Sequence, residues 1–171
     1  RVPKDVAESR DMRVLALCGK RAGYAALSQR VASRFWYSTS ESGESGSEGA
    51  ALVMTSAGAA ADLMAQVRAR AYECRAETAL EDDLAVVFEP LVVEGDWDQA
   101  IALVSEIVST DPKVEPPISD GTAKVIAQRG SAIAVSTNWI YFAQPVTGGD
   151  TEELSDELPT EVEAILDQLS G

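Results

Sequence analysis

Two cysteines, one spaced triplet of carboxylates and a few large aromatic side chains are the residues of this chain that could do chemistry. The 171 residues contain no histidine, which excludes Ser-His-Asp and Cys-His nucleophiles, His-containing zinc sites and an imidazole switch near neutral pH. The sequence also has no GxxxxGKS/T or GxGxxG phosphate loop and no SxxK dyad. We therefore expect no enzymatic activity, no cofactor and no bound nucleotide.

The carboxylates offer one arrangement that could bind a metal. Glu94, Asp96 and Asp98 alternate along the chain, so their oxygens could converge on a calcium ion. A calcium loop normally supplies more ligands and a distal bidentate glutamate, so we interpret the triplet as an acidic turn and expect no metal site. The adjacent acids at 82–83 and 152–153 diverge from the backbone and are expected to be solvated. An enzyme that uses carboxylates would instead need converging acids with strongly perturbed pKa values.

The two cysteines, Cys18 and Cys74, are far apart and lack the CxxC spacing of a redox or zinc site. We interpret them as one long-range disulfide. Closing a loop of roughly 57 residues would stabilise the fold by about 4 kcal/mol in the chain-entropy model. Two buried free thiols in a cytosolic domain are the alternative.

Three aromatic residues are candidates for contact with a ligand. Trp139 and Tyr141 are two positions apart in a segment that reads as a strand, so they would lie on one face of a sheet. Trp97 follows the acidic turn. Large aromatic side chains can line an apolar cleft, and packing in the core is the alternative for all three.

The charge of the chain argues against several partners. Its 28 acidic against 14 basic residues give a net charge of −14, and such a surface repels phosphate backbones and anionic membranes. We expect no nucleic acid partner. No apolar stretch reaches the roughly 18 residues of a membrane span. The first residue is Arg1 and not Met, which we interpret as the start of a trimmed fragment, so a signal peptide, lipid anchor or transmembrane segment could precede it.

The elements that must position these residues follow from hydrophobic periodicity. Alternating positions predict strands over 29–40, 50–55 and 84–91, and a hairpin over 123–137 with its turn at Arg129 and Gly130. The segment 139–142 continues as strand or loop. Between 96 and 110 the composition also fits a helix, but the β-branched residues favour a strand. The polar, glycine-rich stretch 41–48 is expected to be a mobile acidic loop at a hairpin tip.

Two helices are expected beside these strands. Apolar residues recur every three or four positions over 57–75 and place Cys74 on the buried stripe. A last helix begins near Pro159. One or two short helices are expected within 1–30. The size of 18.1 kDa favours one domain over 1–171. The fold class is therefore α+β, with an antiparallel sheet of five or six strands and a long helix and a C-terminal helix packed against it.

The order of these features resembles the actinobacterial secreted sensor-type domains typified by the extracellular domain of the mycobacterial serine/threonine kinase H and related lipoproteins. The segments that carry the resemblance are AADLMAQVRARAYEC, EGDWDQAIALVSEIVST, VIAQRGSAIAVST and EVEAILDQL. The resemblance implies an extracytoplasmic, anchored or tethered domain whose sheet forms a ligand cleft, without catalytic residues. Members of the family often have two disulfides, whereas this chain can form only one.

We expect a non-enzymatic extracytoplasmic ligand-binding or sensor-type domain, held together by Cys18 and Cys74, with an unknown small molecule or cell-envelope ligand near Trp97, Trp139 and Tyr141. The alternative is a cytosolic acidic protein-interaction or adaptor domain, in which the segments 41–48 and 150–163 bind a basic partner.

Overall fold

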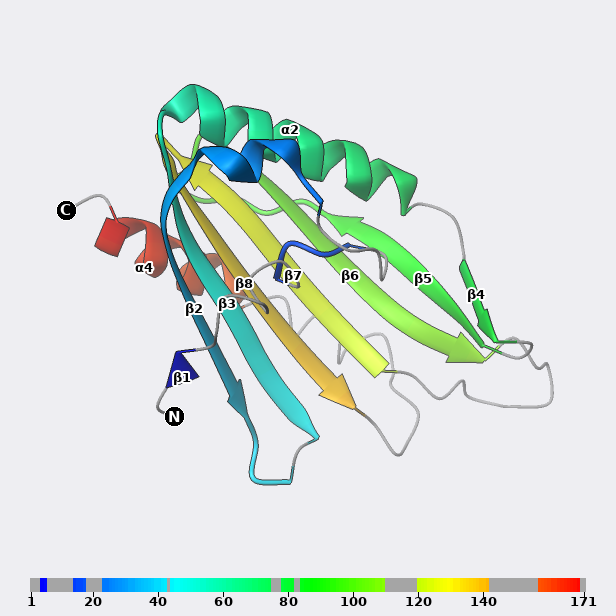
Figure 1. Cartoon of the computed structure of the whole chain (residues 1–171). Helices are drawn as coiled ribbons and strands as arrows, with labels where there is room; N and C mark the ends of the chain where they lie inside the picture. Colours follow the sequence, from blue (N-terminus) through cyan, green and yellow to red (C-terminus); the bar gives the residue numbers. More distant parts are fainter. Residues whose placement is uncertain are drawn as a thin grey trace.

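An antiparallel sheet with the strand order β1-β2-β3-β8-β7-β6-β5-β4 forms the central layer of the protein (Figure 1). The structure is a computed structural model that describes residues 4–5, 14–17, 23–42, 44–74, 78–81, 84–109, 120–141 and 157–169. Within these ranges the strands are β1 (Lys4–Asp5), β2 (Arg30–Thr39), β3 (Ser45–Met54), β4 (Thr78–Glu81), β5 (Leu84–Leu91), β6 (Gln99–Ser109), β7 (Asp120–Arg129) and β8 (Ala132–Tyr141). The six long strands agree with the predicted number, and β1 and β4 add short strands at the two edges.

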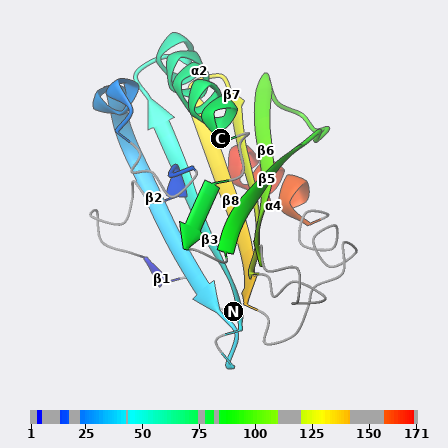
Figure 2. The ribbon, with the colours of Figure 1, turned by 90° about the vertical axis from the view of Figure 1, so that its right-hand side faces the viewer.

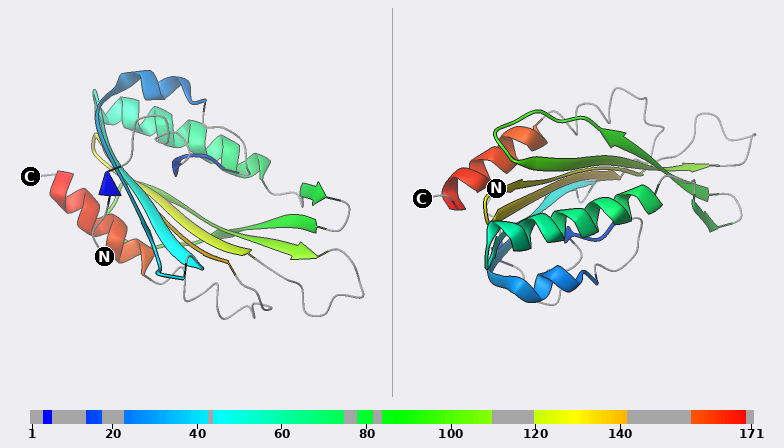
Figure 3. Two further views of the ribbon diagram at one scale, coloured as in Figure 1. Left: turned by 60° about the horizontal axis from the view of Figure 1, so that its bottom comes forward. Right: turned by 90° about the horizontal axis from the view of Figure 1, so that it is seen from above.

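Helices cover both faces of the sheet. The long helix α2 (Ala57–Glu73) lies on one face together with the short 3-10 helix η2 (Ala25–Gln29), and α4 (Leu158–Leu169) lies on the other. Figure 2 shows the sheet from its β4 edge, and Figure 3 shows the two helices on opposite sides of it. The predicted α+β class, with a long helix and a C-terminal helix packed on an antiparallel sheet, is confirmed. Within the described residues, no helix has the length and hydropathy needed to cross a membrane.

The alternation of side chains along the central strands explains why two cores form. In β8, Ile133 and Val135 belong to the core under α2, whereas Ala132 and Ala134 belong to the core under α4. Successive side chains of a strand point to opposite faces, so a strand with a helix on each side must be apolar at nearly every position. The small alanines on the α4 face let that helix approach the sheet closely.

The hairpin between β7 and β8 forms where the sequence predicts it, but its turn lies one residue later than the predicted Arg129 and Gly130. The two strands pair up to Arg129 and Ala132, which leaves Gly130 and Ser131 as the connection. Gly130 has a φ of +56°, a left-handed conformation that glycine adopts without steric cost and that two-residue hairpin turns require.

The helix α2 agrees closely with its predicted range. Ser56 caps its first turn, since its Oγ accepts a hydrogen bond of 3.1 Å from the backbone N–H of Ala59. The residues of its apolar stripe are buried against the sheet: Ala59, Ala60, Leu63, Met64 and Val67. Cys74 follows the last turn as the C-cap.

The expected mobile loop over 41–48 is wrong in its second half. β3 begins at Ser45, so Ser45–Glu48 is strand paired to β2 on one side and β8 on the other. Gly46, within the predicted loop, lies under the ring of Trp139, and Gly49, just beyond the loop, lies under the ring of Trp36: a Cβ at either position would overlap that ring. Of the short helices expected within 1–30, the structure describes the 3-10 helix η2 at Ala25–Gln29, and most of the rest of that segment lies outside the described residues.

Candidate functional site

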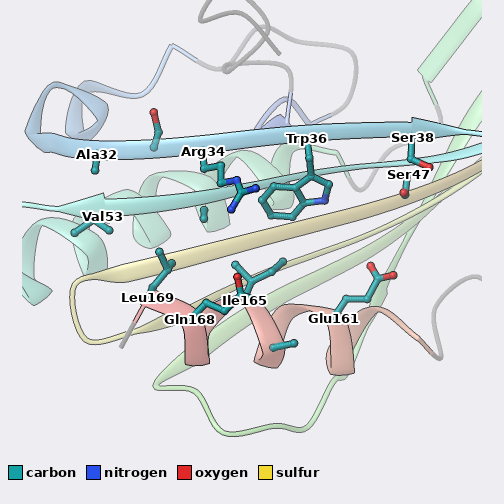
Figure 4. Close-up of a pocket in the computed structure, with 13 residues that line it drawn as sticks. Ala32, Arg34, Trp36, Ser38, Ser47, Val53, Glu161, Ile165, Gln168 and Leu169 are labelled. Atoms are coloured by element: carbon teal, nitrogen blue, oxygen red, sulfur yellow. The ribbon is translucent and has the colours of Figure 1, made fainter. Parts of the chain in front are cut away.

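A cavity of about 660 Å³ lies on the α4 face of the sheet, between that helix and the hairpin of β2 and β3 (Figure 4). It exists because the apolar stripe of α4 packs on β6, β7 and β8 and not on β2 and β3. The volume is in the range of about 300–1,000 Å³ that small-molecule sites occupy. The lining residues are Ala32, Ser33, Arg34, Trp36, Ser38, Ser47, Ala51, Val53, Glu161, Ala164, Ile165, Gln168 and Leu169.

The register of the hairpin gives the cavity two chemically different ends. At one end Ala32 pairs with Val53, and at the other Ser38 pairs with Ser47. The helix α4 follows the same order from polar to apolar side chains as the hairpin. Glu161 in its first turn lies toward the serine end of the cavity (Figure 4). Leu169, about two turns of helix further on, lies toward the alanine and valine end. The cavity is therefore mainly apolar at the end with Ala32, Val53 and Leu169, where Gln168 is a polar lining residue of α4, and polar at the serine end.

Trp36 forms the middle of the sheet wall. It pairs with Gly49 on β3, and a Cβ at that position would overlap the indole ring. The ring therefore lies directly over the glycine backbone and is held there by it. The side chain is half-buried and lines the cavity. Arg34 lines the same wall two positions earlier in β2, on the same face of the strand.

Of two polar side chains at the serine end, one lacks a hydrogen-bond partner and the other has one. The Oγ of Ser38 is buried and has no hydrogen-bond partner. A buried hydroxyl without a partner costs about 1–3 kcal/mol, so a group that reached this atom and formed a hydrogen bond with it would recover part of that cost. The carboxylate of Glu161 accepts a hydrogen bond of 2.6 Å from the Oγ of Ser136 on β8, which orients it from the helix toward the sheet.

The structure does not bring the three predicted ligand-binding aromatics together. Trp139 lies on the α2 face, because it has the same parity along β8 as Ile133 and Val135. Its ring covers Gly46. Tyr141 is the last residue of β8 and pairs with Asp120. Trp97 lies across the sheet from Trp139, against the core under α4.

Trp97 borders a second cavity, of about 510 Å³, formed by the segment between β5 and β6. Its ring lies over Gly95, where a Cβ would overlap it. This cavity is separate from the one that contains Trp36. A single ligand cleft shared by Trp97 and Trp139 is therefore not formed.

The acidic turn beside Trp97 has structural partners. The Oδ2 of Asp98 accepts a hydrogen bond of 2.7 Å from the backbone N–H of Gly130. The Oδ2 of Asp96 lies 3.2 Å from Nη2 of Arg129, whose Nη1 also lies 2.6 Å from Asp167 of α4. These contacts connect the segment to the β7–β8 turn and to α4. In the parts of the chain that the structure describes, no group of acids or cysteines could hold a metal ion.

A second polar cluster lies on the α2 face, where Glu48, Thr137 and Lys124 are directly opposite one another on β3, β8 and β7. Lys124 is buried, and its Nζ donates a hydrogen bond of 3.1 Å to the backbone oxygen of Ala16. Burial lowers the pKa of Lys124 to about 8, against a smaller opposite effect of Glu48. The Oγ1 of Thr137 is buried without a partner. This cluster is covered by the segment 14–17, which contributes Val14, Leu15 and Leu17 to the core.

Cys74 is 1% exposed and belongs to the core under α2. Cys18 lies outside the described residues, so its pairing with Cys74 stays a prediction. Its neighbour Leu17 is buried in the same core as Cys74, which brings the chain into the region that the disulfide requires.

The sequence contains a signal for the cavity beyond the three predicted aromatic residues. Arg34 and Trp36 occupy one face of the predicted strand 29–40 by simple alternation. A tryptophan beside an arginine on a strand face that also holds Ala32 is an amphipathic surface. Its partner surface could not be read in the same way, since the pairing of this hairpin with α4 depends on the fold.

Comparisons with known proteins give one result that concerns the fold. No protein-family model and no curated protein matches the chain. The crystal structure of the extracellular domain of PknH from Mycobacterium tuberculosis is similar, with a TM-score of 0.55 and 10% sequence identity over 88% of this chain and 73% of that chain. At this identity the similarity shows the fold alone, and that fold is the one which the sequence resemblance implied.

Proposed function

We propose that this chain is a non-enzymatic, extracytoplasmic ligand-binding domain of the sensor type, and that the cavity between α4 and the β2–β3 hairpin is its ligand site. The observation that carries the proposal is the buried, unpaired Ser38 Oγ in a cavity of about 660 Å³ with one apolar and one polar end. A small, mostly apolar cavity with a few convergent polar groups is the usual form of a small-molecule site. The similarity of the fold to the extracellular domain of PknH supports the hypothesis of a sensor-type domain.

The chemistry of the lining argues for binding without catalysis. The lining contains neither histidine nor cysteine nor lysine, so no base stands beside the hydroxyls of Ser38 and Ser47 to activate them. Glu161 is the single carboxylate among these residues, and it is hydrogen-bonded to Ser136. General acid and base catalysis by a carboxylate pair needs a second acid at this place.

The extracytoplasmic location rests on two observations. The similar structure is an extracellular domain, and the chain has two cysteines whose predicted disulfide would need an oxidising compartment. We propose a lipoprotein or a membrane-tethered protein as the parent of this domain. The sequence resemblance implies the same type of parent.

Binding to the cavity can be tested with N-phenyl-1-naphthylamine, a neutral apolar dye that fluoresces when it leaves water. We expect saturable binding with one dye per chain. The variant Ala164→Trp places a large ring at the cavity wall from an exposed position of α4, and it should weaken dye binding at least tenfold.

The matched control is Ala65→Trp, which makes the same change at an exposed position of α2 on the other face of the sheet. It should leave dye binding unchanged. Equal loss in both variants, or no saturable binding by the unmodified protein, would overturn the cavity as the ligand site.

A further inference from the structure

The ligand chemistry can be taken further if the cavity is the ligand site, as proposed above. The β2 wall from Ala32 to Ser38 is about 20 Å long at ~3.4 Å per residue. Along this wall the lining changes from alanine, valine and leucine to serine and glutamate. An elongated ligand with one apolar and one polar end matches that order, and a uniformly apolar molecule would leave the serine end without partners (Figure 4).

The polar end favours a neutral group that can both donate and accept. The Ser38 Oγ needs a partner of either kind, and Ser47 offers a second hydroxyl. The Glu161 carboxylate accepts hydrogen bonds and repels an anion, as does the net charge of −14. Arg34 in the same lining opposes a cation. A group with several hydroxyls can form hydrogen bonds with Ser38, Ser47 and Glu161 and carries no charge for Arg34 or Glu161 to repel.

Trp36 adds a flat surface next to these hydroxyl partners. One side of the indole is covered by Gly49, and the half-buried side chain lines the cavity. The face of an aromatic ring is the negative part of its quadrupole. The C–H groups on one face of a sugar ring are weakly positive and flat, so they suit such a surface, while the sugar hydroxyls project sideways toward hydrogen-bonding partners.

We propose that the cavity binds a glycoside with an alkyl substituent, its sugar ring against Trp36 and the serine end, and its alkyl chain between Val53, Ile165 and Leu169. The ligand is thus a neutral amphiphile whose head is a sugar.

The test is isothermal titration calorimetry with octyl β-D-glucoside below its critical micelle concentration. Glucose and 1-octanol are titrated separately as the two halves of the probe. We expect octyl glucoside to bind at least tenfold more tightly than either half. Octyl sulfate and octyltrimethylammonium serve as charged analogues with the same chain, and both should bind more weakly than the glucoside.

Two variants locate the sugar. Trp36→Leu keeps an apolar side chain but removes the ring, so the affinity for octyl glucoside should fall to that for octanol. Ser38→Ala should weaken glucoside binding about fivefold and leave octanol binding unchanged. The matched control is Trp139→Leu on the opposite face of the sheet, and it should bind like the unmodified protein. Thermal melts establish that each variant is folded.

The outcomes separate this inference from the proposed function. Octanol or a charged analogue that binds as tightly as the glucoside would overturn the sugar head and leave the cavity as a ligand site. Loss of glucoside binding in Trp139→Leu in place of Trp36→Leu would place the sugar on the other face and overturn the inference. Failure of every probe, the naphthylamine dye included, would overturn the proposed function itself.

Discussion

Lys124 is buried on the α2 face of the sheet, and its burial makes the stability of the protein depend on pH. Burial lowers its pKa from 10.5 to about 8. Below pH 8 the ammonium group is charged in the folded and the unfolded chain, so the folded state bears the full cost of burying it. Between pH 8 and 10.5 the unfolded chain binds more protons, and stability therefore rises with pH over this window.

Replacing this lysine by an apolar residue of similar length should stabilise the protein at neutral pH. The difference between 10.5 and about 8 corresponds to about 3 kcal/mol. The substitution also removes the hydrogen bond to Ala16, which lowers the free energy of unfolding by about 1 kcal/mol. Lys124→Met should therefore raise the free energy of unfolding by about 2 kcal/mol at pH 7, and this gain should shrink by pH 10, as measured by urea unfolding at both values.

Thr137 provides the control for this pH dependence. Its Oγ1 is buried without a partner, so Thr137→Val should stabilise the protein by about 1 kcal/mol through a group that does not titrate. The gain should be equal at pH 7 and pH 10. A gain of Lys124→Met that is also equal at the two values would contradict a burial cost of the charged amine.

The strand β3 shows how an element positions the candidate site. Gly46 lies under the ring of Trp139 on the neighbouring strand β8, and Gly49 lies under the ring of Trp36 on the other neighbour, β2. The absence of a side chain at position 49 lets the Trp36 ring lie against the sheet, where it lines the cavity. The strand thus acts as a flat support for a ring that belongs to β2.

Gly49→Ala should displace the Trp36 ring, because the new Cβ overlaps it. The ring can swing outward, so we expect a loss of stability of only about 1 kcal/mol, at the low end for an overpacked site. Octyl glucoside binding should weaken as well, at least fivefold, since the ring then enters the cavity. Calorimetry and urea unfolding of the same preparation measure both.

The control for this variant is Gly58→Ala, near the start of α2. A Cβ there meets only the Ser56 Oγ, at 3.7 Å, and alanine favours the helix by about 0.5–1 kcal/mol over glycine. This variant should be as stable as the unmodified protein or more so and should bind the glucoside normally. Normal binding by Gly49→Ala would show that the support of Trp36 by β3 does not matter for the site.

Helices and strands that depend on residues near in sequence were predictable from local patterns of side chains. The alternation in 29–40, the helical stripe over 57–75 and the Arg129–Gly130 turn predicted β2, α2 and the β7–β8 hairpin closely. These elements are determined by side chains near in sequence. The start of β3 was missed because Ser45–Glu48 is ordered by pairing with β8, about 90 residues later in the chain. The same holds for the cavity, since no local pattern places α4 beside β2.

At the scale of the whole molecule, the connection between the N-terminal segment and α2 matters most for the proposed compartment. The segment 14–17 crosses the α2 face, where Leu15 and Leu17 are buried and Ala16 accepts the Lys124 hydrogen bond. Tyr24 adds a second connection, since its hydroxyl donates to the backbone oxygen of Leu15 at 3.1 Å. A Cys18–Cys74 disulfide would make this arrangement covalent at the end of α2.

Intact mass spectrometry after alkylation tests this predicted disulfide. With the denatured, unreduced protein we expect no added alkyl group, and after reduction we expect two. Replacing both cysteines, as Cys18→Ala with Cys74→Ala, should lower the free energy of unfolding by up to about 4 kcal/mol for a loop of this length.

The addition of two alkyl groups before reduction would show that the disulfide is absent. It would also take away the main chemical argument for an oxidising compartment. That result would favour the acidic adaptor alternative, but with a smaller acidic segment than the sequence suggested, because Ser45–Glu48 is committed to the sheet. The thiol state therefore decides between the two compartments independently of whether the cavity binds a glycoside.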